Sequence, residues 1–158
     1  MSGLDKENER HHIKPRVTVI IPCHNHADMI IDAITSVSMQ DYRPIQVVVI
    51  DDGSTDNPEE SIRGLAEKID IPILFIKNET PTGPSAARNR GIEASWESSD
   101  VFMMLDADDL YLQNKISKSV EKYMEDHEQI GIVYTDAIIK NINSILKMYN
   151  GNALEIQN

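Results

Sequence analysis

The sequence lacks the features that would place it in several large classes of protein. Among its 158 residues there is one cysteine, Cys23, so an internal disulfide is excluded and a reducing compartment is favoured. No apolar run approaches the roughly 20 residues that span a membrane, and the polar N-terminus is unlike a signal peptide. Internal repeats and low-complexity segments are also absent. We therefore expect a cytoplasmic protein, and we leave open a peripheral attachment to a membrane surface.

Basic residues are few, because 15 Lys and Arg stand against 26 Asp and Glu, for a net charge of −11. Proteins that bind nucleic acid neutralise its phosphates with Lys and Arg, so this balance argues against a nucleic-acid partner. A nucleotide is not excluded, since a bound metal ion can supply positive charge locally. The length and the 41% hydrophobic content suit one globular domain with a real core.

Strand-like and helix-like segments alternate along the chain. Apolar, largely β-branched runs predict strands at 17–21, 45–50, 73–76, 101–105 and 130–134. Caps predict helices that begin after Asp28, at Asn57-Pro58 and at Pro84. Apolar stripes support the first of these, with Ile30, Ile34 and Val37, and predict a fourth helix, with Ile116, Val120, Tyr123 and Met124. Strands separated by helices in this way predict an α/β fold with a mainly parallel sheet and flanking helices.

Polar clusters follow three of the predicted strands. They are Pro22-Cys23-His24-Asn25, Asp51-Asp52-Gly53-Ser54 and Asp106-Ala107-Asp108-Asp109. In open α/β sheets, ligands bind beyond the carboxyl ends of the strands, so the three clusters are expected to meet in one layer. Asp51 or Asp52 could accept hydrogen bonds from ribose hydroxyls or from a base N–H. The alternative for that pair is a turn beside a helix cap.

The acidic cluster after the fourth strand is the most informative of the three. On extended backbone, side chains two residues apart point the same way, so Asp106 and Asp108 can converge on one ligand. Converging carboxylates repel each other unless a cation lies between them, and oxygen ligands of this kind suit Mg²⁺ or Mn²⁺. Such a cation can hold the phosphates of a nucleotide. A solvated turn with an acidic helix start is the alternative.

The segment from Gly83 to Gly91 adds a predicted helix N-terminus and two arginines, Arg88 and Arg90. A helix N-terminus and a guanidinium both favour anions such as a diphosphate, although arginines on a helix are often only solvated surface. Cys23, His24 and His26 lack the second ligand pair of a zinc site, so we expect structural or solvent-exposed roles for them.

Four segments, taken together and in order, resemble the family 2 glycosyltransferases: VTVIIPCHN, VVVIDDGSTD, GPSAARNRGI and VFMMLDADD. The similarity covers roughly residues 16–135. It implies the family's A-type, Rossmann-like fold, which binds a nucleotide sugar. It also implies a nucleoside-diphosphate-sugar donor, often linked to uridine, a saccharide or other hydroxyl acceptor, and a divalent cation, Mn²⁺ or Mg²⁺.

The resemblance also implies roles for residues on the nucleotide side. Pro22, Cys23 and Asn25 match the segment that borders the base, although threonine is commoner at the position of Cys23. Asp51 and Asp52 match the acids that contact base and ribose. Arg88 matches the arginine of the Ala-Arg-Asn motif beside the nucleotide.

Asp106 and Asp108 match the family's Asp-x-Asp motif. By this resemblance Asp108 is the direct metal ligand, and Asp106 is shared between ribose and metal. The implied reaction is a single displacement at the anomeric carbon with inversion, assisted by a general base on the acceptor side.

The chain departs from the family in its C-terminal part. The family's general base is an acid well downstream of Asp-x-Asp, and no candidate for it is found before the chain ends at Asn158. We therefore expect the N-terminal, donor-binding portion of an A-type enzyme with its C-terminal part missing. The expected parts are a flexible arm at 1–14, a nucleotide-sugar-binding domain at 15–136 and, at 137–158, the start of the acceptor half. The strand at 130–134 would then leave an open sheet edge, through which the chain could self-associate.

Two other functions share some of these features. A non-catalytic module that binds a nucleotide sugar would carry the same motifs, and only the acceptor half would separate it from an enzyme. A phosphohydrolase of the haloacid-dehalogenase type also has Asp-x-Asp after an apolar strand. Its first Asp is usually near the N-terminus and the motif is followed by Thr or Val, whereas Asp109-Leu110 follows here.

Overall fold

The chain folds as two units, one of residues 1–117 and one of residues 118–158, and each is described by itself. The computed structural model describes residues 14–135, 137–140, 145–148 and 154–157. The predicted flexible arm at 1–14 therefore lies, except for Lys14, outside the described residues. No helix in the described ranges is both long enough and apolar enough to cross a membrane.

Four parallel strands form the sheet of the first unit: β1 Val17–Cys23, β2 Ile45–Asp52, β3 Ile73–Asn78 and β4 Val101–Met104. Their order across the sheet is β3-β2-β1-β4. Cys23 lies opposite Asp51, and Asp52 lies opposite Asn78, so the carboxyl ends of β1, β2 and β3 are level. The prediction of a mainly parallel sheet is confirmed, and so are the first four predicted strands.

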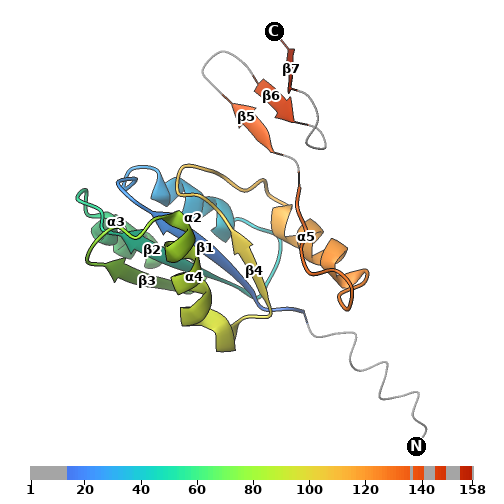
Figure 1. Cartoon of the computed structure of the whole chain (residues 1–158), viewed down its shortest axis with the longest axis horizontal. Helices are drawn as coiled ribbons and strands as arrows, with labels where there is room; N and C mark the ends of the chain where they lie inside the picture. Colours follow the sequence, from blue (N-terminus) through green and yellow to red (C-terminus); the bar gives the residue numbers. More distant parts are fainter. Residues whose placement is uncertain (1–13, 136, 141–144, 149–153, 158) are drawn as a thin grey trace, which may run out of the picture. The chain divides into compact units, whose positions relative to one another are not determined.

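Helices cover both faces of this sheet, with α4 on one face and α2 and α3 on the other (Figure 1). Their bounds are α2 Ile30–Ser38, α3 Pro58–Ala66 and α4 Pro84–Ser95, with a short 3₁₀ turn, η2, at Trp96–Ser98. A fourth helix, α5 Lys115–Met124, spans the boundary between the two units. The predicted starts at Asn57-Pro58 and Pro84 are confirmed, because Pro58 and Pro84 open α3 and α4.

The predicted cap at Asp28 is wrong. Met29 occupies the cap position of α2, and no side chain caps the helix. The main-chain carbonyl of His26 instead accepts hydrogen bonds from the N–H groups of Met29 and Ile30, at 3.1 and 2.9 Å. A turn of the backbone thus does the work that the sequence assigned to the Asp28 carboxylate.

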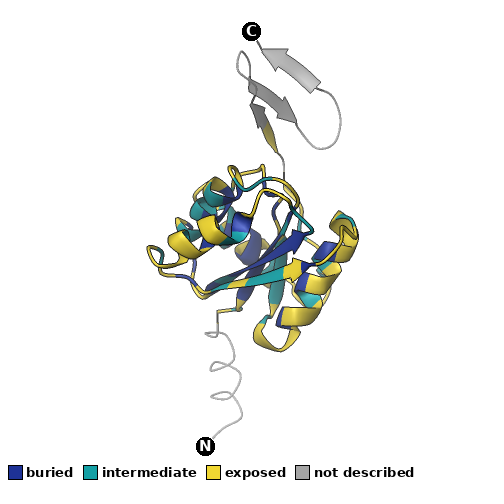
Figure 2. Cartoon of the chain, turned by 90° about the vertical axis from the view of Figure 1, so that its left-hand side faces the viewer, coloured by how far each residue is buried: buried dark blue, intermediate teal, exposed yellow. Residues whose placement is uncertain are grey.

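The core lies on both faces of β1 and β2, which Figure 2 shows as the buried centre of the fold. Ile20, Val48 and Ile50 pack with Ala87 of α4. Because side chains alternate along a strand, Val19, Val47 and Val49 point to the opposite face. On α2, the predicted apolar stripe of Ile30, Ile34 and Val37 is buried. A run that is apolar at nearly every position thus becomes a strand covered on both sides.

Small residues seat α4 closely on the sheet. Ala87, Gly91 and Ser95 form its buried face. A Cβ added at Gly91 would lie 2.7 Å from Cγ2 of Ile20, and Ile20 has no exposed surface. This contact holds α4 close to the middle of β1, and the helix itself begins after the loop that follows the carboxyl end of β3.

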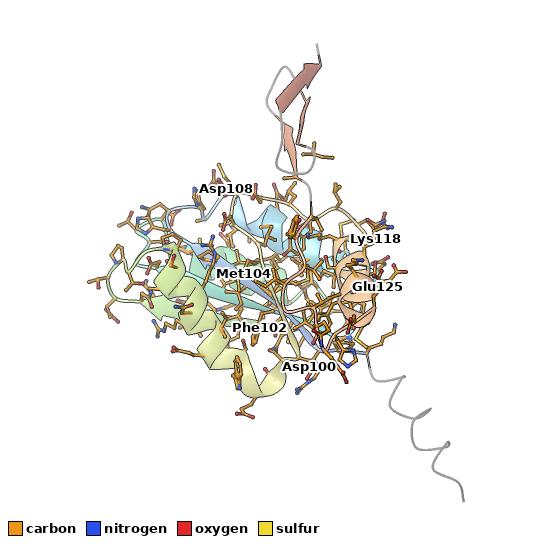
Figure 3. The ribbon with its side chains drawn as sticks, turned by 45° about the vertical axis from the view of Figure 1, so that its right-hand side comes forward. Asp100, Phe102, Met104, Asp108, Lys118 and Glu125 are labelled. Atoms are coloured by element: carbon orange, nitrogen blue, oxygen red, sulfur yellow. The ribbon has the colours of Figure 1, made fainter. Side chains whose placement is uncertain are left out.

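The opposite, amino end of the sheet is closed by an ion pair between Arg16 and Asp100. The Arg16 guanidinium donates to both carboxylate oxygens of Asp100, at 3.0 and 2.9 Å, and its backbone N–H donates at 2.7 Å. Asp100 precedes β4, whereas Asp108 lies in the loop beyond the other end of that strand (Figure 3). The Arg16–Asp100 ion pair and the acidic cluster are therefore at opposite ends of β4.

The predicted strand at 130–134 is wrong. These residues have no regular secondary structure, and the side chains of Ile132 and Tyr134 are 85% and 87% exposed. A strand is stable only when it is paired, and no described strand pairs with this segment. In the second unit, the described strands β5 Ile138–Lys140, β6 Ile145–Met148 and β7 Leu154–Gln157 form an antiparallel sheet in that order. Self-association through a sheet edge stays a prediction.

The contact between Gly91 and Ile20 predicts a position-specific effect of adding one methyl group. Gly91→Ala should be less stable than Gly64→Ala by roughly 1–3 kcal/mol, the usual cost of overpacking a filled core. Gly64 is the matched control, because it also lies in a helix but has no atom within 4 Å of an added Cβ. Urea unfolding of both variants measures the difference, and equal stabilities would contradict the close approach.

Candidate functional site

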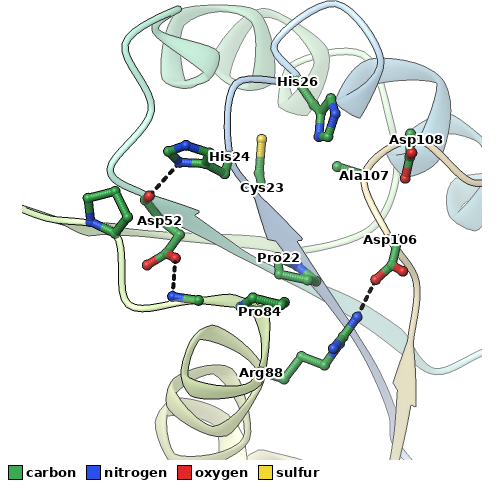
Figure 4. A pocket seen from close by; sticks show the side chains of 12 residues that line it. Pro22, Cys23, His24, His26, Asp52, Pro84, Arg88, Asp106, Ala107 and Asp108 are labelled. Carbon is green, nitrogen blue, oxygen red and sulfur yellow. Dashed lines mark hydrogen bonds and ion pairs between the residues drawn. The ribbon is translucent and has the colours of Figure 1, made fainter.

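A cavity of about 440 Å³ lies at the carboxyl edge of the parallel sheet (Figure 4). The three polar clusters and the start of α4 meet around it. Its lining residues are Pro22, Cys23, His24, His26, Asp52, Pro81, Gly83, Pro84, Arg88, Asp106, Ala107 and Asp108. Segments that are distant in the sequence thus form one concave site, as the positions of the strand ends predicted.

Six of the eight predicted site residues line this cavity: Pro22, Cys23, Asp52, Arg88, Asp106 and Asp108. Asp51 and Asn25 do not line it. Asp51 is adjacent to Asp52 on β2, so the two side chains point to opposite faces of the sheet. Asp51 is fully buried, and its Oδ1 accepts the N–H of Ser54 at 2.9 Å, so it holds the turn after β2.

Asn25 joins the loop after β1 to the loop after β2. Its backbone adopts a positive φ of 58°, a conformation that Asn tolerates better than most residues. Its side-chain Oδ1 accepts hydrogen bonds from the N–H and the hydroxyl of Thr55, at 2.9 and 3.1 Å, and its own N–H donates to Ser54 Oγ. Asn25 therefore holds the two loops together without lining the cavity itself.

The ring of His24 is held in one orientation and one tautomer. Nδ1 lies 2.7 Å from the carbonyl oxygen of Asp52, which can only accept, so Nδ1 carries the proton. Nε2 lies 3.2 Å from Nδ2 of Asn25, which can only donate, so Nε2 accepts. From the sequence we expected a structural or solvent-exposed role for His24, and the structure places its ring in the cavity wall.

The carboxylate of Asp52 organises the loop that precedes α4. It accepts hydrogen bonds from Asn78 Nδ2 at 2.6 Å, from the hydroxyl and N–H of Thr82 at 2.8 and 2.9 Å, and from the Gly83 N–H at 2.7 Å. Burial alone would raise the pKa of Asp52, but these hydrogen bonds outweigh it and lower the pKa to about 2. Asp52 is therefore ionised throughout the neutral range.

This arrangement changes the expected anion site at the start of α4. The N–H groups of Thr82 and Gly83, the two residues before α4, already bind the Asp52 carboxylate. Asn78 is fixed in turn by Arg90, which donates to its Oδ1. Sequence reasoning missed Asn78 and Thr82. The available signal was the position of Asn78 at the end of the third strand, level with Asp52.

Arg88 is the guanidinium that faces the cavity, and it is paired with Asp106 at 2.5 Å (Figure 4). The Arg88 side chain is 29% exposed, and that of Asp106 is 50% exposed. Among the described residues, Nε of Arg88 is one of the few buried side-chain atoms without a hydrogen-bond partner. An anion in the cavity would share Arg88 with Asp106 and could engage a guanidinium that is already oriented.

The acidic cluster is a turn, so the prediction of extended backbone from Asp106 to Asp108 is wrong. The N–H of Asp109 donates to the carbonyl of Asp106 at 3.0 Å, and Ala107 is buried at the turn. Asp106 and Asp108 both line the cavity, but the Asp106 carboxylate points toward Arg88 (Figure 4).

The pKa of Asp109 is raised by burial and by the charges of Asp108 and Asp106. No group of three or more His, Cys, Asp or Glu side chains in the described ranges is arranged to hold a metal ion.

The thiol of Cys23 is buried in the cavity wall. Burial raises its pKa to about 11, partly offset by the N–H of His26, which donates to the sulfur. The thiol is therefore protonated at neutral pH, and a protonated thiol is a poor nucleophile and metal ligand. Cys23 contributes shape and apolar surface to the cavity.

Comparison with known protein families shows to which family the chain belongs. The family model described as "Glycosyl transferase family 2" matches residues 18–156, which include every residue of the cavity. The chain belongs to this family. The affiliation argues against a phosphohydrolase of the haloacid-dehalogenase type, because the Asp-x-Asp motif now has its place within a matched family 2 domain.

Curated relatives in this family are longer than the chain. A glycosyltransferase of unassigned specificity from Rickettsia bellii is 38% identical over 73% of this chain and 16% of its own length. The GalNAc(5)-diNAcBac-PP-undecaprenol beta-1,3-glucosyltransferase of Campylobacter jejuni is 26% identical over 89% of this chain and 44% of its own length. The chain thus spans less than half of each of these relatives.

A solved structure supports the A-type fold. The mannosyltransferase PcManGT from Pyrobaculum calidifontis, in complex with GDP-Man and Mn²⁺, aligns with a TM-score of 0.66 and 28% identity. The alignment covers 71% of this chain and 33% of that protein. The four-stranded parallel sheet with its flanking helices is therefore an A-type glycosyltransferase fold.

The hydrogen bonds of Asp52 predict a pH-dependent contribution to stability. Its folded pKa of about 2 is below the usual value for an aspartate, so its stabilisation is complete above about pH 4 and is lost as the pH falls through 2. Asp52→Asn should lower the free energy of unfolding by about 2 kcal/mol at pH 6, and by much less at pH 2. Urea unfolding of both proteins at the two pH values measures this. A gap of the same size at pH 2 would show that the charge of Asp52 contributes little.

Proposed function

We propose that the chain is the donor-binding part of a glycosyltransferase that transfers a sugar from a nucleoside diphosphate to a hydroxyl acceptor. The main support for this proposal is the cavity at the carboxyl edge of the sheet, which Arg88, Asp106 and Asp108 line. The chain's membership of glycosyltransferase family 2 agrees with it. A nucleotide sugar has a base whose flat faces can pack on an apolar surface, polar hydroxyls and a doubly charged diphosphate. The cavity offers a surface of matching chemistry for each part.

The base and ribose are proposed to occupy the side formed by the ends of β1 and β2. Pro22, Cys23 and the fixed ring of His24 offer a largely apolar wall there. Asp52 is on the same side, but its oxygens already accept hydrogen bonds from Asn78, Thr82 and Gly83. We therefore propose that Asp52 mainly holds the loop before α4 in position. Asp51 holds the turn after β2, and Asn25 joins that turn to the loop after β1.

The diphosphate is proposed to lie between Arg88 and the acidic cluster. Arg88 offers a guanidinium whose planar fork suits phosphate oxygens. The two carboxylates fit a divalent cation, because Mg²⁺ and Mn²⁺ are commonly held by one or two carboxylates, with phosphates and waters as the remaining ligands. Asp108 is the proposed direct ligand, since Asp106 is engaged by Arg88. A cation bound there would neutralise negative charge that develops on the departing diphosphate.

The proposed reaction is one displacement with inversion. The acceptor oxygen forms a bond to the anomeric carbon as the bond from that carbon to the diphosphate oxygen breaks. Arg88 stabilises the charge on the leaving group. The proton of the acceptor hydroxyl passes to a general base, and no described residue is assigned that role. The donor nucleoside is proposed to be uridine from the family resemblance, although PcManGT was solved with GDP-Man.

A second candidate function is a module that binds a nucleotide sugar without transferring it. The observation that favours it is the absence, among the described residues, of an acid assignable as the base. Incubation of the chain with a UDP-sugar, an acceptor and Mn²⁺, followed by measurement of UDP release, tests this second function. Steady release would identify an enzyme and exclude the module, whereas binding without release is expected both of the module and of an isolated donor-binding part.

The metal assignment predicts different effects for neighbouring carboxylates. Calorimetry should show UDP binding that Mn²⁺ strengthens about tenfold or more, and Asp108→Asn should abolish this gain because it removes the proposed ligand. Asp109→Asn is the matched control: it removes the same charge one residue away but does not line the cavity, so we expect a change below about threefold. Equal Mn²⁺ dependence in wild type and Asp108→Asn would refute the assignment.

A further inference from the structure

The loop that carries the acidic cluster is fastened at both ends. We call residues 105–114, between β4 and α5, the acidic loop. At its start the N–H of Leu105 donates to the carbonyl of Ile20 at 3.1 Å, which continues the pairing of β4 with β1. Farther along, the hydroxyl of Tyr111 donates to the carbonyl of Met104 at 2.7 Å. The loop therefore returns toward the strand from which it began.

The far end of the acidic loop is fastened to the C-terminal part of α2 and the residues that follow it. Ser36 accepts the N–H of Tyr111 at 3.0 Å. Asp41 accepts the hydroxyl of Ser117 at 3.0 Å. Between these two contacts lies Gln40, which is 5% exposed. Three neighbouring side chains thus hold one stretch of the chain that is distant in sequence.

Gln40 makes the most connections of the three. Its Nε2 donates to the carbonyls of Leu112 and Ser36, at 2.8 and 3.1 Å. Its Oε1 accepts the N–H of Ile116 at 3.0 Å. Ile116 lies in the first turn of α5, where N–H groups have no partner within the helix. Because the amide donates on one side and accepts on the other, only one orientation of the side chain satisfies all its partners.

The hydrogen bonds of Gln40 are important for the conformation of the acidic loop because this loop carries several negative charges close together. Asp106, Asp108 and Asp109 lie within four residues, and their mutual repulsion favours any conformation that spreads them apart. Among the described residues, Asp106 is paired with Arg88, and no ion pair to Asp108 or Asp109 is found. The position of Asp108 thus depends on the backbone on either side of it. Before it, Leu105 is held on β1; after it, Tyr111 is held by Ser36 and Met104, and the Gln40 contacts to Leu112 and Ile116 follow directly.

We propose that Gln40 is a positioning residue for the acidic loop. Its amide holds Leu112 and Ile116, and so sets the place of Asp108 relative to Arg88 without touching a ligand. The inference rests on the proposed function, because it concerns the metal-dependent part of donor binding. A purely structural role would lower stability and leave the metal dependence of binding unchanged.

The test compares two substitutions of the same kind. Gln40→Met removes the three hydrogen bonds and keeps the length of the side chain. Gln46→Met is the matched control: Gln46 Nε2 donates to Thr18 Oγ1 and Ser98 Oγ, at 2.7 and 2.8 Å, near the amino end of the sheet. Thermal unfolding gives the stability of each variant, and calorimetry with UDP, with and without Mn²⁺, gives the affinities.

Gln40→Met should weaken UDP binding in the presence of Mn²⁺ by about tenfold and change binding without Mn²⁺ much less, whereas Gln46→Met should change neither by more than about twofold. Equal effects of the two variants at equal loss of stability would overturn the inference. If Gln40→Met does not fold, Gln40→Glu replaces it: this variant keeps the acceptor for Ile116 but loses the donor to Leu112, and unchanged Mn²⁺ dependence in it would also overturn the inference. If the wild type itself binds no UDP with Mn²⁺, the proposed function fails instead.

Discussion

The hydrogen bonds of the Asp52 carboxylate are the interaction on which the site depends. They connect the end of β2 to Asn78 at the end of β3 and to Thr82 and Gly83 before α4. The close packing of Gly91 on Ile20 fixes the height of α4 above the sheet, and Asp52 fixes the loop by which the chain enters that helix. Arg88, one turn into α4, thereby acquires a defined position in the cavity.

This role of Asp52 also changes the electrostatics of the cavity. The N–H groups of Thr82 and Gly83 before α4 are used internally, and the charged groups on the cavity lining are one guanidinium, Arg88, and the carboxylates of Asp52, Asp106 and Asp108. In a chain with a net charge of −11, that surface does not attract an anion by itself. The proposed divalent cation would resolve the conflict, because Asp106 and Asp108 would attract it and it would attract the phosphates in turn. The acidic cluster is, in this account, a means of binding an anion through a cation.

Local patterns predicted most of the fold. The β-branched runs gave four strands because a segment that is apolar at every position is stable only between two layers of helices, and Pro58 and Pro84 marked helix starts because proline suits the first turn. The segment 130–134 has a similar composition but lacks a pairing partner among the described strands, which is not a local property. Asp28 looked like a cap, and the carbonyl of His26 took its place.

The candidate site was predicted in outline, since parallel strands bring their carboxyl ends to one edge. Its internal connections were not, because they join residues far apart in the sequence: Asp52 with Thr82, Asn25 with Thr55, and Gln40 with Leu112. Strand alternation alone separates Asp51 from Asp52, and that signal was available in the sequence. The turn from Asp106 to Asp109 required knowledge of where β4 ends.

Paramagnetic broadening by Mn²⁺ in the presence of UDP would report whether the edge cavity binds a nucleoside diphosphate through a cation at Asp108. In amide NMR spectra of the 158-residue chain, substoichiometric Mn²⁺ with UDP should broaden the resonances of residues around Asp108 and Arg88 first. The resonances around Arg16 and Asp100, at the amino end of the sheet, should stay sharp. Broadening centred away from the cavity, or unchanged by UDP, would contradict the account.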